Sequence, residues 1–104
     1  MDVLIRIKRA VAAGNVIFTE KAEVELEADG LRKLDAIEAI LNAAVIYKTL
    51  RSTSPRRARR DEKLYVIQST NFDGLYIYTK GKLVRREDRY VFYVLVSSKR
   101  TYRP

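Results

Sequence analysis

The residues of this chain that could do chemistry are cations and tyrosines, and they concentrate in its second half. Residues 47–60 contain six Lys or Arg and no Asp or Glu. Before Tyr47 the chain has 6 basic and 8 acidic residues, whereas from Tyr47 onward it has 15 basic and 5 acidic residues. All 7 tyrosines lie at or after Tyr47. Cations for phosphate and aromatic rings for base stacking are what a nucleic-acid surface requires.

The absence of both Cys and His excludes much familiar chemistry. Without them there is no thiol nucleophile, disulfide, imidazole base or Cys/His zinc site. The sequence also lacks a Gly-x-Ser-x-Gly elbow and a Gly-x-x-x-x-Gly-Lys phosphate loop. A magnesium site stays formally open, but the acids of the second half are scattered: Asp61, Glu62, Asp73, Glu87 and Asp88. We expect any catalysis to need no metal or other cofactor.

RNA cleavage remains open to such a chain, because the nucleophile is the neighbouring 2′-hydroxyl of the RNA. The protein need only align that hydroxyl, stabilise charge on phosphorus and move two protons. Lys or Tyr can carry a proton if nearby cations lower its pKa, and Arg can grip a phosphate. Our candidate catalytic residues are Lys48, Lys99, Tyr76 and Tyr78. Our candidate RNA-binding residues are Arg51, Arg56, Arg57, Arg59, Arg60 and Arg100.

The first half of the chain has the patterns of helices. Asp2 can cap a helix whose apolar residues Leu4, Ile7 and Val11 share one face, and Gly14 can end it. This helix is amphipathic, so a membrane-surface helix is the alternative interpretation.

Two further helices are expected before the basic segment. Thr19 can cap a helix that ends at residues 29–30, although the alternation of apolar and Glu residues there also suits a strand. Asp35 and Glu38 have the spacing of a capping box, with Asp35 as the cap. This spacing predicts a short third helix that ends near residues 42–44.

From Leu64 onward the apolar residues alternate with a period of two. Residues 64–70, 75–84 and 91–98 therefore predict three strands of an antiparallel meander. Residues 91–96 are apolar on both faces, which predicts a central strand. Residues 79–82 interrupt the middle run and suggest a bulge or an exposed portion.

These elements predict one α+β domain over residues 1–104. We expect two or three helices packed on a three- to four-stranded antiparallel sheet. Residues 45–50 turn β-like, which places Lys48 at or near the end of a strand, and residues 15–18 predict an extended connector. No apolar run approaches the roughly 18 residues of a membrane span. We expect a soluble, cytoplasmic protein with no membrane partner.

Several segments resemble the MqsR family of type II toxins, within the wider RelE-like group. They are Ile-Lys-Arg-Ala-Val-Ala-Ala-Gly-Asn-Val, Phe-Thr-Glu-Lys-Ala, Tyr-Lys-Thr at residues 47–49 and Val-Leu-Val-Ser-Ser-Lys at residues 94–99. The resemblance implies a RelE-like fold, a metal-independent endoribonuclease acting on mRNA and a cognate antitoxin protein. It also implies that Lys48 and Lys99 belong to the active site, with Tyr76 or Tyr78 as the tyrosine.

Three functions follow from these observations. The first is a ribonuclease toxin that leaves a 2′,3′-cyclic phosphate and a 5′-hydroxyl. The second is a non-catalytic RNA- or DNA-binding module that uses the same basic surface. The third is an interaction protein whose cationic face holds an acidic partner. The first requires that Lys48 and Lys99 converge on one patch of the folded chain, and none of the three predicts the oligomeric state.

Overall fold

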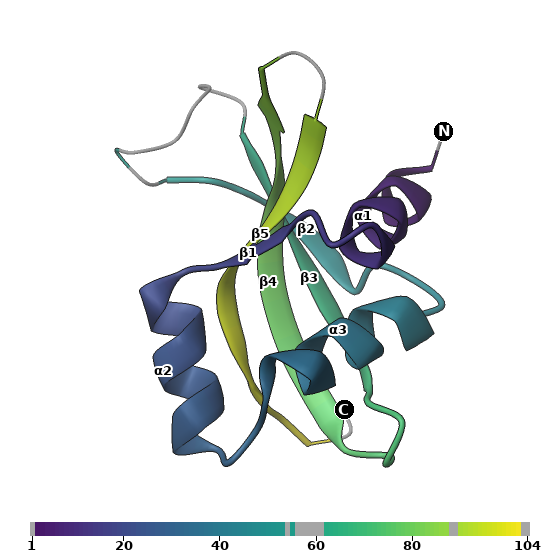
Figure 1. Ribbon diagram of the computed structural model, residues 1–104, viewed down its shortest axis with the longest axis vertical. Coiled ribbons are helices and arrows are strands. Elements are labelled where there is room, and N and C mark those ends of the chain that lie inside the picture. Colours follow the sequence, from purple (N-terminus) through teal and green to yellow (C-terminus); the bar gives the residue numbers. More distant parts are fainter. Residues whose placement is uncertain (1, 54, 56–61, 88–89, 103–104) are drawn as a thin grey trace.

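The computed structural model describes residues 2–53, 55, 62–87 and 90–102, which form three helices and a five-stranded sheet (Figure 1). The helices are α1 (Val3–Ala12), α2 (Glu20–Ala28) and α3 (Lys33–Asn42). The strands are β1 (Val16–Phe18), β2 (Lys48–Arg51), β3 (Lys63–Thr70), β4 (Tyr76–Arg86) and β5 (Tyr90–Arg100). The α+β class is confirmed. None of these three helices is long and apolar enough to cross a membrane.

The sheet has the strand order β1-β5-β4-β3-β2. Strands β2 to β5 form the predicted antiparallel meander, with longer strands than expected at the β4–β5 hairpin. The predicted three- to four-stranded antiparallel sheet lacks one strand: β2 to β5 are four antiparallel strands, and β1 adds a fifth, parallel strand at the edge beside β5. Residues 15–18 are too few for an alternation of apolar and polar residues to be visible in the sequence. Their backbone groups pair with those of β5. Tyr93 N–H donates to Asn15 O at 2.9 Å and Thr19 N–H donates to Leu95 O at 3.0 Å.

The predicted caps of the first two helices are confirmed. The Asp2 carboxylate accepts from Leu4 N–H at 3.0 Å, and Thr19 Oγ1 accepts from Ala22 N–H at 3.2 Å. Gly14 follows α1 with a φ of 82°, the left-handed conformation that glycine adopts without strain. In the segment after Thr19, the N-cap and the helix propensity of Ala, Glu and Leu therefore outweigh the strand-like alternation.

The third helix begins three residues earlier than its capping pattern suggested. Its N-cap is Arg32, and Asp35 lies in the first turn. Arg32 N–H donates to Asp35 Oδ2 at 2.7 Å, so the aspartate reaches back to the cap instead of being the cap. The helix ends at Asn42, as predicted.

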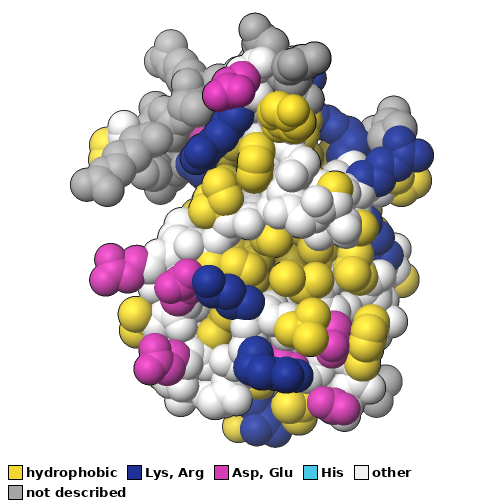
Figure 2. Space-filling model, in the orientation of Figure 1, with side chains coloured by type: hydrophobic (Ala, Val, Ile, Leu, Met, Phe, Trp, Pro, Cys, Tyr) yellow, Lys and Arg dark blue, Asp and Glu magenta, His cyan; other side chains and the backbone are white. Residues whose placement is uncertain are grey.

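Helices α1 and α3 cover one face of the sheet, and α2 lies beside β5 (Figure 1). Apolar side chains from these layers form the core: Leu4, Ile7, Ala10, Val11, Ala22, Ile40, Ala43, Ile67, Tyr93 and Leu95. Figure 2 views the helix side, where acidic side chains gather over α2. The sheet face turned away from α1 and α3 carries no helix of the described chain.

The bulge suggested at residues 79–82 is confirmed. Lys80 pairs with Ser97 but Gly81 pairs with Leu95, so one extra residue of β5 lies between these pairs. A Cβ on Gly81 would lie 2.6 Å from Cζ of Tyr93, which means that the aromatic ring crosses directly over the glycine. The bulge therefore sits where β4 and a buried tyrosine approach most closely.

Candidate nucleic-acid interface

The alternation of β4 decides which candidate residues point away from the helices. Ile77 and Thr79 are fully buried, whereas Tyr76, Tyr78 and Lys80 are partly exposed. Successive side chains of a strand point to opposite faces. We call the sheet face away from α1 and α3 the lysine–tyrosine face; its described residues include Lys48, Val66, Gln68, Tyr76, Tyr78, Lys80, Lys82, Ser97 and Lys99.

A cross-strand pair on this face joins β4 to β5. Tyr78 of β4 pairs with Lys99 of β5, and the Lys99 Nζ atom lies 5.3 Å from the centroid of the Tyr78 ring. This separation allows a cation–π contact between the ammonium and the ring. On its other side Tyr78 pairs with Gln68 of β3. One row across three strands therefore offers an amide, a phenol and an ammonium.

The adjacent row on the same face contains two more lysines. Lys48 pairs with Val66, Val66 pairs with Lys80, and Lys80 pairs with Ser97. Lys48 starts β2 and does not end it, so this expectation is corrected. Lys48 and Lys99 thus share a face, but β3 and β4 separate their strands by roughly 14 Å. Lys80 lies between them.

The candidate arginines do not join this face. Arg100 pairs with the buried Ile77, which places it toward the helix side. Arg51 pairs with Lys63, two residues from the core-packed Tyr65, so it also lies toward the helix side and near the other end of the sheet. The remaining candidates, Arg56, Arg57, Arg59 and Arg60, lie outside the described residues.

The lysines of the sheet differ in their ionic partners. Lys82 forms a partly buried salt bridge with Glu62, with Nζ and Oε1 3.2 Å apart. Among the described residues, no carboxylate lies within ion-pairing distance of Lys48 or Lys80. An anion on this face would therefore meet two lysines whose charge is not already neutralised.

The pKa of Tyr78 moves in the direction opposite to the one a general base needs. Burial raises it first, and the negative charge of Glu25 raises it further. We expected neighbouring cations to lower the pKa of a catalytic Lys or Tyr. Tyr78 is instead a phenol that keeps its proton at neutral pH, so it can donate a hydrogen bond or a proton.

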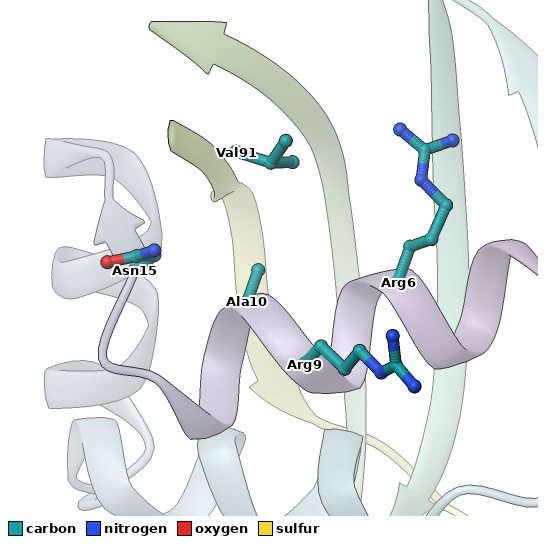
Figure 3. Close-up of a pocket in the computed structure, with 5 residues that line it drawn as sticks. All are labelled: Arg6, Arg9, Ala10, Asn15 and Val91. Atoms are coloured by element: carbon teal, nitrogen blue, oxygen red, sulfur yellow. The ribbon is translucent and has the colours of Figure 1, made fainter. Parts of the chain in front are cut away.

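A hollow of about 260 Å³ lies on the helix side, between α1 and β5 (Figure 3). It is lined by Arg6, Arg9, Ala10, Asn15 and Val91. The side chains of Arg6 and Arg9 extend in different directions in Figure 3, so they do not converge on one anion. This hollow is not part of the lysine–tyrosine face.

Among the residues of the site that were not predicted from the sequence are Gln68, Lys80, Ser97 and Glu25. Lys80 could have been found by counting two residues from Tyr78 along the strand. Gln68 and Glu25 could not, because strand register brings one beside Tyr78 and helix packing brings the other. No cluster of three Asp or Glu residues that could hold a metal ion occurs in the part of the chain the structure describes.

In comparisons with known proteins, no family model, curated protein or solved structure matches the chain.

Proposed function

We propose that this protein is a metal-independent endoribonuclease toxin of a type II toxin–antitoxin pair, with a RelE-like or MqsR-like fold. The observation that carries the proposal is the contact of Lys99 with Tyr78 on a sheet face that also presents Lys48 and Lys80. Its substrate is mRNA, and its cellular partner is a cognate antitoxin protein.

Each residue of the face has a separate task in this mechanism. Lys48 and Lys80 bind phosphates of the RNA backbone and hold the strand across β2 to β5. Lys99 stabilises the negative charge that develops on the scissile phosphate as the 2′-hydroxyl attacks. Tyr78 donates its proton toward the leaving 5′-oxygen, which suits a phenol whose pKa is raised.

Gln68 aligns the substrate in the proposed catalysis. The Gln68 amide, beside Tyr78, can hold the 2′-hydroxyl in line with the bond that breaks. The proton of that hydroxyl passes to solvent. Alignment and charge stabilisation therefore carry most of the rate in this proposal.

A non-catalytic RNA- or DNA-binding module is the second candidate. The observation that favours it is the raised pKa of Tyr78. The phenol stays neutral, and its ring can stack on a base. Such a module binds single strands in a salt-sensitive way and breaks none of them.

The two functions are separated by incubating the protein with RNA in EDTA and analysing the ends of the products. We expect 2′,3′-cyclic phosphate and 5′-hydroxyl ends, and a loss of about 100-fold or more in rate for Lys99→Ala. The control is Lys33→Ala, which removes an equal charge from an exposed lysine paired with Glu23. A requirement for added magnesium, or products with 5′-phosphates, contradicts the mechanism.

Expression in growing cells tests the toxin part of the proposal. The wild-type protein should arrest growth, and the Lys48→Ala, Lys99→Ala double variant should not. Harmless expression of the wild-type protein favours the binding module.

A further inference from the structure

The end of β5 that carries Lys99 is held by a helix, not by a neighbouring strand. β1 pairs with β5 only from Tyr93 to Leu95, so the outer edge of β5 is unpaired beyond that point. Helix α2 and its C-cap residue, Asp29, cover this edge with two carboxylates. Ser98 N–H donates to Glu25 Oε1 at 3.2 Å, and Arg100 N–H donates to Asp29 Oδ2 at 2.7 Å. These bonds replace the strand that an open edge otherwise recruits.

Glu25 does more than cover the edge, because it also reaches the lysine–tyrosine face. Its Oε1 atom accepts a second hydrogen bond, from Ser97 Oγ at 2.8 Å. Ser97 lies on that face, in register with Lys80. The charge of Glu25 also acts on Tyr78, the partner of Lys99. One carboxylate is therefore tied to the outer edge and to the lysine–tyrosine face of the strand that carries the candidate catalytic lysine.

We propose that Glu25 is a positioning residue of the site, which fixes the Lys99 end of β5 and places a negative charge beside the Lys99–Tyr78 pair. This inference rests on the proposed function. Two donors restrain the Glu25 carboxylate, so its position is set by the fold and not by the substrate. Glu25 itself touches neither the RNA nor the reacting atoms.

Tyr78 is surrounded by few charged groups, which makes the effect of Glu25 measurable. Lys99 faces it from β5, Lys80 and Tyr76 flank it on β4, and β3 contributes the neutral Gln68. On α2, Glu25 acts on Tyr78, whereas Asp29 bonds the backbone of Arg100 one turn later. Asp29 is therefore the matched control: it anchors the same strand, and Glu25 is the charge that raises the pKa of the phenol.

The first test measures the anchor without any activity assay. Amide hydrogen exchange of Ser98 should accelerate by roughly tenfold or more in Glu25→Ala, because its acceptor is lost. Glu25→Gln keeps an acceptor oxygen and should retain most of the protection. Asp29→Ala should accelerate exchange at Arg100 and leave Ser98 protected. Unchanged exchange of Ser98 in Glu25→Ala overturns the anchoring role.

The second test measures the charge by following Tyr78 in an NMR titration, with the signal assigned through Tyr78→Phe. Glu25→Gln should lower the pKa of Tyr78, because removal of a nearby negative charge favours the phenolate. Asp29→Asn should lower it less. An equal or larger shift in Asp29→Asn shows that the effect is not specific to Glu25 and overturns this part of the inference.

The third test links Glu25 to cleavage of RNA. Glu25→Ala should reduce kcat by about tenfold or more with little change in KM, since Lys99 acts on the transition state. Glu25→Gln should move the alkaline limb of the pH–rate profile to lower pH, together with the pKa of Tyr78. If the wild-type protein cleaves RNA but these variants match it, Glu25 is not a positioning residue and the proposed function stands. If the wild-type protein does not cleave RNA, the proposed function fails, and the exchange and titration results still decide the structural role.

Discussion

Among single residues, the adjacent serines Ser97 and Ser98 of β5 differ in the hydrogen bonding of their hydroxyl groups. Ser97 Oγ donates to Glu25, whereas Ser98 Oγ is buried and has no hydrogen-bond partner among the described residues. A buried hydroxyl without a partner costs free energy that an alanine would not. The two serines therefore contribute to the stability of the strand with opposite sign.

We predict that Ser98→Ala leaves the free energy of unfolding unchanged or raises it, by up to about 1 kcal/mol. Ser97→Ala should lower it by about 1 kcal/mol, because a hydrogen bond to a charged group is lost. Urea unfolding of both variants checks this pair of values. A larger loss of stability in Ser98→Ala than in Ser97→Ala would show that the buried hydroxyl has a partner in solution.

Residue types, their placement and the family resemblance predicted part of this site. Lys48 and Lys99 were chosen by type, by their place near strand ends and by the resemblance, and Tyr78 because it shares a strand face with Tyr76. The three residues do share one face. The direction of the pKa shift of Tyr78 was not predictable, because it depends on burial and on Glu25, which is distant in the sequence. Local sequence shows which groups exist but not the dielectric and charges around them.

At the scale of elements, a buried polar pair joins α3 to the turn between β3 and β4. Asn71 Nδ2 donates to Asp35 Oδ1 at 3.1 Å, while Asn71 Oδ1 accepts from the backbone N–H groups of Asp73 and Leu75. Asp35 is also bonded to the N-cap of α3. One carboxylate therefore organises a helix start and a hairpin turn.

The pKa of Asp35 is lowered, chiefly because the backbone N–H of Arg32 donates to its carboxylate, and this gives a pH prediction. A carboxyl whose folded pKa lies below its unfolded value of about 3.9 stabilises the fold above that value. This contribution is lost as pH falls through the folded pKa. We expect Asp35→Asn to be less stable than wild type at neutral pH and the difference to shrink in acid. Urea unfolding at several pH values measures it, and a difference independent of pH contradicts the prediction.

The crossing of Tyr93 over Gly81 gives a second prediction at this scale. Gly81→Ala should lower the free energy of unfolding by about 1–3 kcal/mol, because the new Cβ meets the ring of Tyr93. Combining it with Tyr93→Leu should cost less than the sum of the two single changes, because the clash disappears. Thermal unfolding of the three variants tests this, and simple additivity would mean that the two residues do not touch.

Elements with strong local signals were predicted well. Asp2 and Thr19 mark helix starts that the structure confirms, and the alternation after Leu64 marks the meander. β1 was missed because its three residues are fixed by pairing with β5, which is far along the chain. The start of α3 was predicted three residues too late, because an Asp can serve either as the N-cap or as the residue whose side chain bonds back to the N-cap.

At the scale of the whole molecule, the described sheet has two unlike faces. One is covered by α1 and α3 (Figure 1). The strand pairing places Lys48, Tyr78, Lys80 and Lys99 on the other. The acids of the first half gather over α2, at the edge of the sheet. Charge is thus separated in space much as it is along the chain, which was predictable, whereas the position of Arg51 and Arg100 toward the helix side was not.

This separation predicts how salt affects RNA binding. Replacing Lys48, Lys80 and Lys99 with alanine should reduce the magnitude of the slope of log affinity against log salt by about 2, since each phosphate contact to a single strand contributes about 0.7. Fluorescence anisotropy with a labelled RNA measures the slope. An unchanged slope in the triple variant would mean that these lysines do not contact phosphate.

We propose that nucleic acid lies on the lysine–tyrosine face. The decisive experiment is NMR mapping of the protein with a single-stranded DNA oligonucleotide, which lacks the 2′-hydroxyl and cannot be cleaved by the proposed mechanism. The largest shifts should fall on Gln68, Tyr78, Lys80 and Lys99, with little change in α1 and α3. Shifts confined to the helix side, or none at millimolar protein and DNA, would contradict the claim.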